Sequence, residues 1–460
     1  MIPYIDYSRH GRPFKAENPF VKEIKPLNVF VDRATVQTED MEFLLRQADG
    51  EKLLLISTER EGNAYLEYET ENGDPVAFSV YGPDGTERSR HGIRYLSQYK
   101  RMASSPDWNR WASSEEIERA LIVTKTAESL NAHIFITNDK FLLEHNDIGI
   151  IKDVYPLNVT DATALIGLIN RRHNNFTIVI DRTGPATMST KHGRWSFFWY
   201  ASRDLLPSAW RLVTGCAQFS DTDKYRDLAL TAISRTSNAL KCRDHIHQQI
   251  FLEQSNSSTE DAIFYLEYYL ISFTAAFDVL ARVVDGIYNP RQRNGRPIRP
   301  LTWRNPDWLN GISLADPILA ASMQPEAFNR DVLEFLARLR NYIHAEGLQG
   351  AMHSKDGRPA PILLQVPAPE VDSIVEIINR IGDGEWTFDR RYHHHDMLSL
   401  EIGDVVERLT PLVIKALDNL MSLIDITRIP DFDPARVQTE APEKWPSKNE
   451  ILDIRKLLGL

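Results

Sequence analysis

Residues that could carry out phosphodiester chemistry lie close together in the stretch 335–347, whose sequence is FLARLRNYIHAEG. A histidine titrates near neutral pH and can transfer protons, and a guanidinium beside it can hold a phosphate or stabilise a negatively charged transition state. Arg340 and His344 are four residues apart, so on a helix they are neighbours on one face, whereas Arg338 lies a turn earlier on an adjoining face. This combination suits cleavage of a phosphodiester without a metal ion.

Two amphipathic helices are predicted to position these residues. Around the arginines and the histidine, apolar residues recur at steps of three and four, and Gly347 is placed to end the helix. A second helix is predicted over about 262–287, after a capping sequence at Ser258–Asp261. Glu267 and Asp278 lie on this second helix, where either could orient the histidine or pair with an arginine. The apolar positions of the first helix are Val332, Phe335, Leu336, Leu339 and Ile343.

The arginine-to-histidine stretch resembles the motif of HEPN domains, helical bundles that include many prokaryotic ribonucleases of toxin and antiphage systems. In these domains an arginine is followed after four to six residues by a histidine, often with a small polar residue directly after the arginine. Five residues separate Arg338 from His344, whereas Arg340 is followed by Asn341 but is only three residues from the histidine. The resemblance implies a cofactor-free site of His344, Asn341 and either arginine, completed across a homodimer.

A second group of candidate residues is acidic. Buried strands are predicted to end at Asp32 and at Asp139, and the helix predicted between them carries Glu116 and Glu118. In open α/β sheets, ligands bind at the carboxyl ends of the strands. Grouped carboxylates repel one another unless a hard cation such as Mg²⁺ or Mn²⁺ lies between them. We therefore expect these four acids to be candidate metal ligands that activate water against a phosphodiester.

The same region resembles the PIN-like metal-dependent ribonucleases, best over 116–170. The similarity rests on the acidic helix, on the sequence AESLNA that follows within it and on the TND sequence that ends at Asp139. The resemblance implies that Asp32 is the first acid, Glu116 or Glu118 the second and Asp139 the third of a Mg²⁺ or Mn²⁺ site. It implies a degenerate member of the family, because a hairpin-rich insertion interrupts the pattern and no fourth acid is assigned.

The predicted elements give an α+β protein: an N-terminal α/β (PIN-like) domain followed by an all-α HEPN-like helical bundle. Alternating residues around an Asn72-Gly73 turn predict the inserted hairpin. The last helix offers a docking site for a protein partner. The expected segments are an N-terminal arm over 1–26, the α/β domain over 27–182, a connector over 183–219, the helical domain over 220–428 and a C-terminal tail over 429–460.

A Pro- and Arg-rich segment over 289–310 separates the two predicted bundle helices. It shows no core pattern, and its charge opposes the net charge of −11 of the whole chain. A long segment of this kind inside a domain is more often functional than merely connecting. It is a candidate for contacting an RNA backbone, with a disordered surface loop or a dimer strap as the alternatives. The predicted RNA-binding residues are Arg291, Arg293, Arg296, Arg299, Trp303 and Arg304.

Composition limits the class of protein. The chain has 460 residues, 42% hydrophobic and 25% charged, which is ordinary for globular proteins and sufficient for two or three cores. Two cysteines give no disulfide framework, no apolar run is long enough to cross a bilayer, and the first residues do not read as a secretory signal. We therefore expect a cytoplasmic protein.

These patterns lead to three alternative functions. The first is an RNA-cleaving or RNA-binding protein of a prokaryotic defence or toxin-like system, with metal-independent cleavage by the arginine and histidine of the helical domain. The second is a non-catalytic helical module for oligomerisation and sensing that binds RNA, a nucleotide or a protein. The third is a metal-dependent PIN-like nuclease. Metal dependence separates the first from the third, because arginine and histidine chemistry survives chelation.

Overall fold

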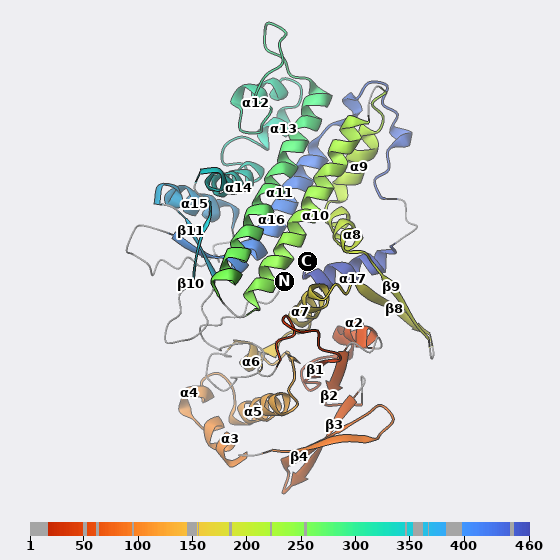
Figure 1. The fold of residues 1–460 in the computed structure, drawn as a ribbon, viewed down its shortest axis with the longest axis vertical. Coiled ribbons are helices and arrows are strands. Elements are labelled where there is room, and N and C mark those ends of the chain that lie inside the picture. Colours follow the sequence, from red (N-terminus) through yellow and green to blue (C-terminus); the bar gives the residue numbers. More distant parts are fainter. Residues whose placement is uncertain are drawn as a thin grey trace. The chain divides into compact units, whose positions relative to one another are not determined.

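The chain folds into two units of mixed α and β structure. In the computed structural model, contacts divide it into an α/β unit (Met1–His192, Ser354–Ala360 and Leu452–Leu460) and a helical unit (Gly193–His353 and Pro361–Ile451) (Figure 1). The structure describes residues 17–48, 53–60, 64–93, 96–144, 154, 156–183, 186–220, 223–252, 255–345, 347–352, 362–366, 368–382, 398–441 and 446–460.

A seven-stranded sheet in the order β5-β4-β3-β2-β1-β6-β7 forms the centre of the α/β unit. Five neighbouring strands, β3, β2, β1, β6 and β7, are parallel to one another. Strands β4 and β5 extend the sheet beyond β3 in antiparallel pairing. The hairpin turn predicted at Asn72-Gly73 joins β3 to β4, and both residues have positive φ, as this turn requires. The strands are β1 (Leu27–Val31), β2 (Leu53–Ser57), β3 (Ala64–Glu71), β4 (Asp74–Tyr81), β5 (Glu87–Gly92), β6 (Ile134–Ile136) and β7 (Pro156–Leu157).

Side chains on both faces of the central strand β1 are buried. Phe30 stacks on Phe135 of β6, with ring centroids 5.6 Å apart, in the core formed with helix α5. Val29 and Val31 alternate with Phe30 and are also fully buried, as expected for a parallel strand covered on both sides. The helices are α2 (Thr38–Ala48), α3 (Leu96–Ala103), α4 (Pro106–Asn109), α5 (Ser114–Ser129), α6 (Lys140–Glu144) and α7 (Val159–Arg172).

The helical unit contains two long helices, α10 and α11, that pack along each other and against α16 (Figure 1). A small antiparallel sheet, β10-β11-β12, accompanies them, so this unit is mostly rather than entirely helical. The elements are α8 (Arg194–Leu205), α9 (Pro207–Cys216), α10 (Lys224–Ile250), α11 (Asn256–Tyr288), α12 (Pro306–Ser313), α13 (Pro317–Ala321), α14 (Phe328–Ala345), β10 (Gln349–Met352), β11 (Ile362–Val366), α15 (Ala368–Ile381), β12 (Leu398–Glu401) and α16 (Ile402–Leu423).

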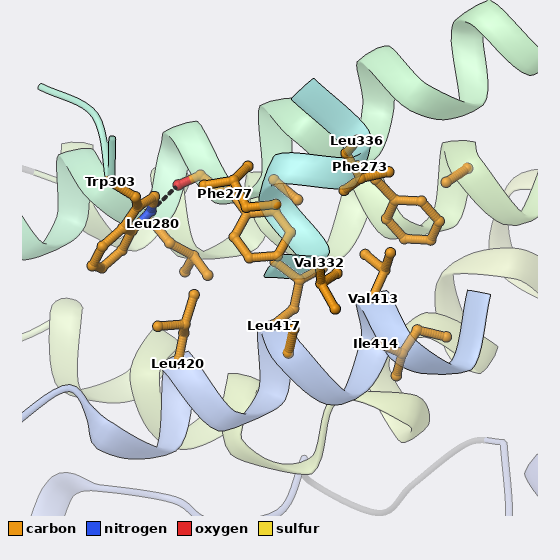
Figure 2. Packing of buried hydrophobic residues seen from close by; sticks show 14 of the residues in the cluster. Phe273, Phe277, Leu280, Trp303, Val332, Leu336, Val413, Ile414, Leu417 and Leu420 are labelled. Atoms are coloured by element: carbon orange, nitrogen blue, oxygen red, sulfur yellow. Dashed lines mark hydrogen bonds between the residues drawn. The ribbon is translucent and has the colours of Figure 1, made fainter. Parts of the chain in front are cut away.

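The core of the helical unit lies between α11, α14 and α16. Figure 2 shows Phe273 and Phe277 of α11 beside Leu336 of α14, with Val413 and Leu417 of α16 on the opposite side. All five side chains are fully buried. The predicted apolar face of α14 is therefore confirmed as a core face, and the predicted packing of α11 on the motif helix is also observed.

Two boundaries differ from those expected. Helix α11 begins at Asn256, because Ser255 rather than Ser258 is its N-cap and forms a capping box with that serine. Strand β8 (Thr177–Thr183) pairs with β9 (Ala186–Lys191) in a separate two-stranded sheet. The expected connector over 183–219 is divided, since β9 belongs to the α/β unit while α8 and α9 belong to the helical unit.

The C-terminal helix α17 (Lys448–Leu458) docks on the chain's own α/β unit through residues 452–460. Arg46 of α2 pairs with Asp453 at 2.8 Å, and Arg171 of α7 donates a 2.6 Å hydrogen bond to the carbonyl of Leu457. The last helix thus packs on its own chain, and binding of a protein partner through the C-terminal tail stays a prediction. No helix in the described part of the chain is long and apolar enough to cross a membrane.

Candidate functional sites

The carboxyl ends of β1 and β6 form the first candidate site. The chain runs from β1 outward to β2 and β3 on one side of the sheet and later to β6 and β7 on the other. The order of the parallel strands therefore reverses between β1 and β6, which is the position where open α/β sheets bind ligands. Asp32 directly follows β1, and the sequence Thr137-Asn138-Asp139 directly follows β6. The sequence correctly predicted that these two acids lie at one edge of the sheet.

Asp32 is buried, with only 1% of its surface exposed, and its carboxylate has several hydrogen-bond donors. Oδ2 accepts hydrogen bonds from the hydroxyls of Thr35 at 3.0 Å and Thr137 at 3.1 Å, and Oδ1 accepts one from the amide of Ala34 at 3.3 Å. Oδ2 also accepts a hydrogen bond from Nη1 of Arg119 at 3.0 Å. An ionised carboxylate can remain buried when donors and an opposite charge compensate for lost hydration.

Arg119 of α5 connects the two aspartates. Its Nη1 donates to Asp32 and its Nη2 donates to Oδ2 of Asp139, so one guanidinium spans both carboxylates. The other oxygen of Asp139 accepts hydrogen bonds from the amides of Phe141 at 2.9 Å and Leu142 at 3.4 Å. Burial by itself would lower the pKa of Arg119. The two carboxylates together have the larger effect, so the pKa of Arg119 lies above its ordinary value. The guanidinium is therefore a fixed positive charge between the two acids.

The two glutamates expected to complete this site have other partners. Glu116 forms a capping box at the start of α5, where its Oε2 accepts hydrogen bonds from the amide and hydroxyl of Ser113, both at 2.8 Å. These hydrogen bonds lower the pKa of Glu116. Glu118 lies 4.0 Å from Nζ of Lys100. The structure thus brings together Asp32 and Asp139 of the four predicted acids, and joins them through Arg119.

The chemistry of these donors does not fit the metal site that the PIN-like resemblance implies. A hard dication needs oxygen ligands around it, whereas here a cationic side chain lies between the two closest carboxylates. Within the described residues, no group of three or more His, Cys, Asp or Glu side chains is placed to hold a metal. The sequence also contains Asp161, which lies in the first turn of α7, and Asp147 and Asp153, which lie outside the described residues.

Helix α14 carries the second candidate site. Arg338 is part of an ion pair with Glu370 of α15, and its side chain is 31% exposed. Arg340 lies close enough to α11 for its charge to act on Asp278. Burial raises the pKa of Asp278, and the positive charge of Arg340 offsets only part of this rise. Among the described residues, no carboxylate lies within 4 Å of the Arg340 guanidinium. The two arginines of the motif therefore differ: Arg338 is paired with a glutamate, whereas Arg340 has no such partner among the residues that the structure describes.

The remaining motif residues lie at the end of the same helix. Asn341 is exposed, and His344 is in the last turn of α14, with its side chain outside the described part of the structure. Directly after the helix, the amide of Leu348 donates a 3.1 Å hydrogen bond to Glu267 of α11. Both acidic positions expected near the motif thus lie close to α14 or to the residues that follow it: Asp278 is near Arg340, and Glu267 is near Leu348.

The arginine-rich segment between α11 and α14 is only partly as expected. Arg291, Arg293, Arg296 and Arg299 are exposed, and Arg304 pairs with Glu334 at 3.1 Å. Trp303 corrects the prediction, because its side chain is fully buried and its indole donates a 2.8 Å hydrogen bond to the carbonyl of Phe277 (Figure 2). This tryptophan belongs to the helical core and not to an RNA-binding surface.

Sequence reasoning missed Arg119, Thr35 and Thr137. One indication was available: the capping sequence at Ser113 already gave Glu116 a structural role, and Arg119 is the basic residue in the next turn of the same helix. The contact of Arg119 with Asp32 joins residues 87 positions apart, so a local pattern cannot predict it.

Comparison of this chain with protein-family models, curated proteins and solved structures found no match.

Proposed function

We propose that the helical unit binds RNA and cleaves it without a metal ion, as part of a prokaryotic defence or toxin-like system. His344 acts on the 2′-hydroxyl or on the leaving oxygen, and Arg340 stabilises the negative charge of the phosphorane. General acid-base catalysis by a histidine and charge stabilisation by an arginine are together sufficient for this reaction type. The proposal follows from the HEPN resemblance of α14.

The observation that carries the choice of arginine is the difference between Arg338 and Arg340. Arg338 is held by Glu370, and a guanidinium must leave its carboxylate before it can bind a phosphate. Arg340 has no carboxylate within 4 Å among the described residues and lies four residues before His344, on the same face of α14. Arg340 therefore supplies the positive charge, and Arg338 fastens α14 to α15.

Cleavage of an end-labelled pool of single-stranded RNA, with and without EDTA, tests this function. His344→Ala and Arg340→Ala should each lower the cleavage rate by about a hundredfold or more, whether or not EDTA is present. Arg338→Ala serves as the control and should keep most of the activity in the folded fraction. EDTA-sensitive cleavage that survives His344→Ala but is lost in Asp139→Ala would instead place the chemistry in the α/β unit.

A second candidate is RNA binding without cleavage, and an aromatic stack on α8 that is exposed at Trp195 favours it. Trp195 is 59% exposed and stacks on Trp199, with ring centroids 5.6 Å apart. The guanidinium of Arg203 lies 5.6 Å from the centre of the Trp199 ring. These residues are spaced by four along one face of the helix, and such stacks of aromatic rings and cations suit unpaired bases.

RNA affinity of catalytically inactive His344→Ala protein tests this candidate. Replacing Trp195 by Ala in that background should weaken binding of an unstructured oligonucleotide about tenfold, since one stacked base contributes roughly 1–3 kcal/mol. Trp111→Ala is the matched control, because Trp111 is 50% exposed and also has an arginine over its ring. Equal effects of both substitutions would argue against a site on α8.

A further inference from the structure

We propose that Arg119 takes the place of a metal ion in the acidic site of the α/β unit. In this arrangement the guanidinium is the permanent counterion of Asp32 and Asp139, and the unit does not take up Mg²⁺ or Mn²⁺ at these carboxylates. The proposal concerns the α/β unit alone and does not depend on RNA cleavage by the helical unit.

The positions of the donors support this role. A guanidinium is planar and presents several N–H groups, so a single side chain can bind two carboxylates at once. Nη1 of Arg119 donates to Asp32 and Nη2 donates to Asp139. A divalent cation shared by these two acids would need the same carboxylate oxygens, because Oδ2 of each aspartate accepts the arginine hydrogen bond.

The remaining acceptor positions of the aspartates are also used by the protein. Oδ2 of Asp32 already accepts from Thr35 and Thr137, and Oδ1 accepts from the amide of Ala34. Oδ1 of Asp139 accepts from two amides at the start of α6. Little capacity for coordinating a cation is left, and Glu116 of α5 is not available as a further ligand, since it binds Ser113.

Burial makes the arginine necessary. The side chains of Asp32 and Asp139 are 1% and 9% exposed, so two neighbouring ionised carboxylates would repel strongly without a cation. The Arg119 side chain is 34% exposed, so it is more accessible to solvent than the two acids that it contacts. A removable positive side chain at this position makes the proposal testable by substitution.

Direct counting of bound Mn²⁺ by electron paramagnetic resonance tests the proposal on the full-length protein. The wild type and Asp139→Asn should bind the same amount of Mn²⁺. Arg119→Met should create one new Mn²⁺ site, and the double variant Arg119→Met/Asp32→Asn should lose it. Lys125→Met is the matched control, because Lys125 lies on the same helix and pairs with Glu128, and it should bind no more Mn²⁺ than the wild type.

A second measurement covers the case in which Arg119→Met binds no metal. If the arginine is the counterion, Arg119→Met lowers the thermal midpoint, and adding Asp139→Asn to it costs less than Asp139→Asn costs in the wild type. Additive effects of the two substitutions would overturn the proposal. A Mn²⁺ site in the wild type that is lost in Asp139→Asn would also overturn the proposal. With Mn²⁺ at a hundredfold excess over its Kd, such a site would raise the Tm of the wild type by roughly 5–10 °C.

Discussion

At the scale of single residues, a buried charged cluster in the helical unit connects α10 to α16. Glu407 of α16 accepts a 2.8 Å hydrogen bond from Nη2 of Arg243 and lies 2.6 Å from Nε2 of His247. Burial raises the pKa of Glu407, but the charges of Arg243 and His247 and their hydrogen bonds outweigh burial and lower it to about 2. Tyr269, which is also close to this cluster, is fully buried, and burial raises its pKa, so it remains neutral.

This cluster predicts how stability depends on pH. The folded pKa of Glu407 is below its ordinary value of 4.5, so the ionised carboxylate stabilises the fold above about pH 4.5, and this stabilisation is lost as the pH falls toward 2. Glu407→Gln should destabilise the protein by about 3–5 kcal/mol at pH 7, because the buried charge of Arg243 loses the carboxylate of Glu407. Denaturant unfolding at several pH values measures both effects.

The control for this prediction is a substitution at an exposed ion pair. Arg226→Gln removes the ion pair between Arg226 and Asp227, whose side chains are 38% and 61% exposed, and should leave the stability nearly unchanged because solvent screens this pair. The prediction fails if wild type and Glu407→Gln lose stability in parallel between pH 4.5 and pH 2, because the carboxylate would then not be the group that titrates.

At the scale of elements, the docking of α17 depends on a close approach to α7. A Cβ atom at Gly167 would lie 2.2 Å from the carbonyl oxygen of Leu457, which is far too close for a contact with backbone. Ile454 and Leu458 of α17 are fully buried, so displacing this helix exposes apolar surface. Glycine is therefore required at this position of α7 by packing and not by backbone conformation.

Gly167→Ala should accordingly loosen the C-terminal helix. We expect a loss of about 1–3 kcal/mol from overpacking, together with faster hydrogen exchange of the amides in residues 452–460. Hydrogen exchange with mass spectrometry makes the measurement. Gly92→Ala is the control, since a Cβ there has no atom within 4 Å and should leave this exchange unchanged. Unchanged exchange in Gly167→Ala would show that α17 tolerates the displacement.

At the scale of the whole molecule, we predict a homodimer, because the HEPN resemblance implies a site completed by two copies of α14. Light scattering after size exclusion should give twice the mass of one chain. Mixing His344→Ala with Arg340→Ala protein should restore part of the cleavage activity if each site takes residues from both copies. A monomeric protein that still cleaves RNA would contradict the shared site and leave the chemistry within one chain.

Much of the local structure followed from the sequence. Alternating residues around Asn72-Gly73 predicted the hairpin, because a turn is formed by neighbours in the chain, and the cap that Ser113 and Glu116 form at the start of α5 is equally local. The apolar face of α14 was predictable because it repeats with the period of a helix. The positions of Asp32 and Asp139 at one sheet edge followed from strand ends in a parallel sheet.

Tertiary structure decided which groups meet. The sequence supplied four acids for one site, but only the fold places Arg119 between two of them and turns Glu116 toward Ser113. Trp303 lies in a segment with no core pattern, yet packing between helices buries it against Phe277. The last helix docks on α7 of its own chain. These contacts join residues far apart in sequence, so they depend on how the elements pack and not on the local pattern that forms them.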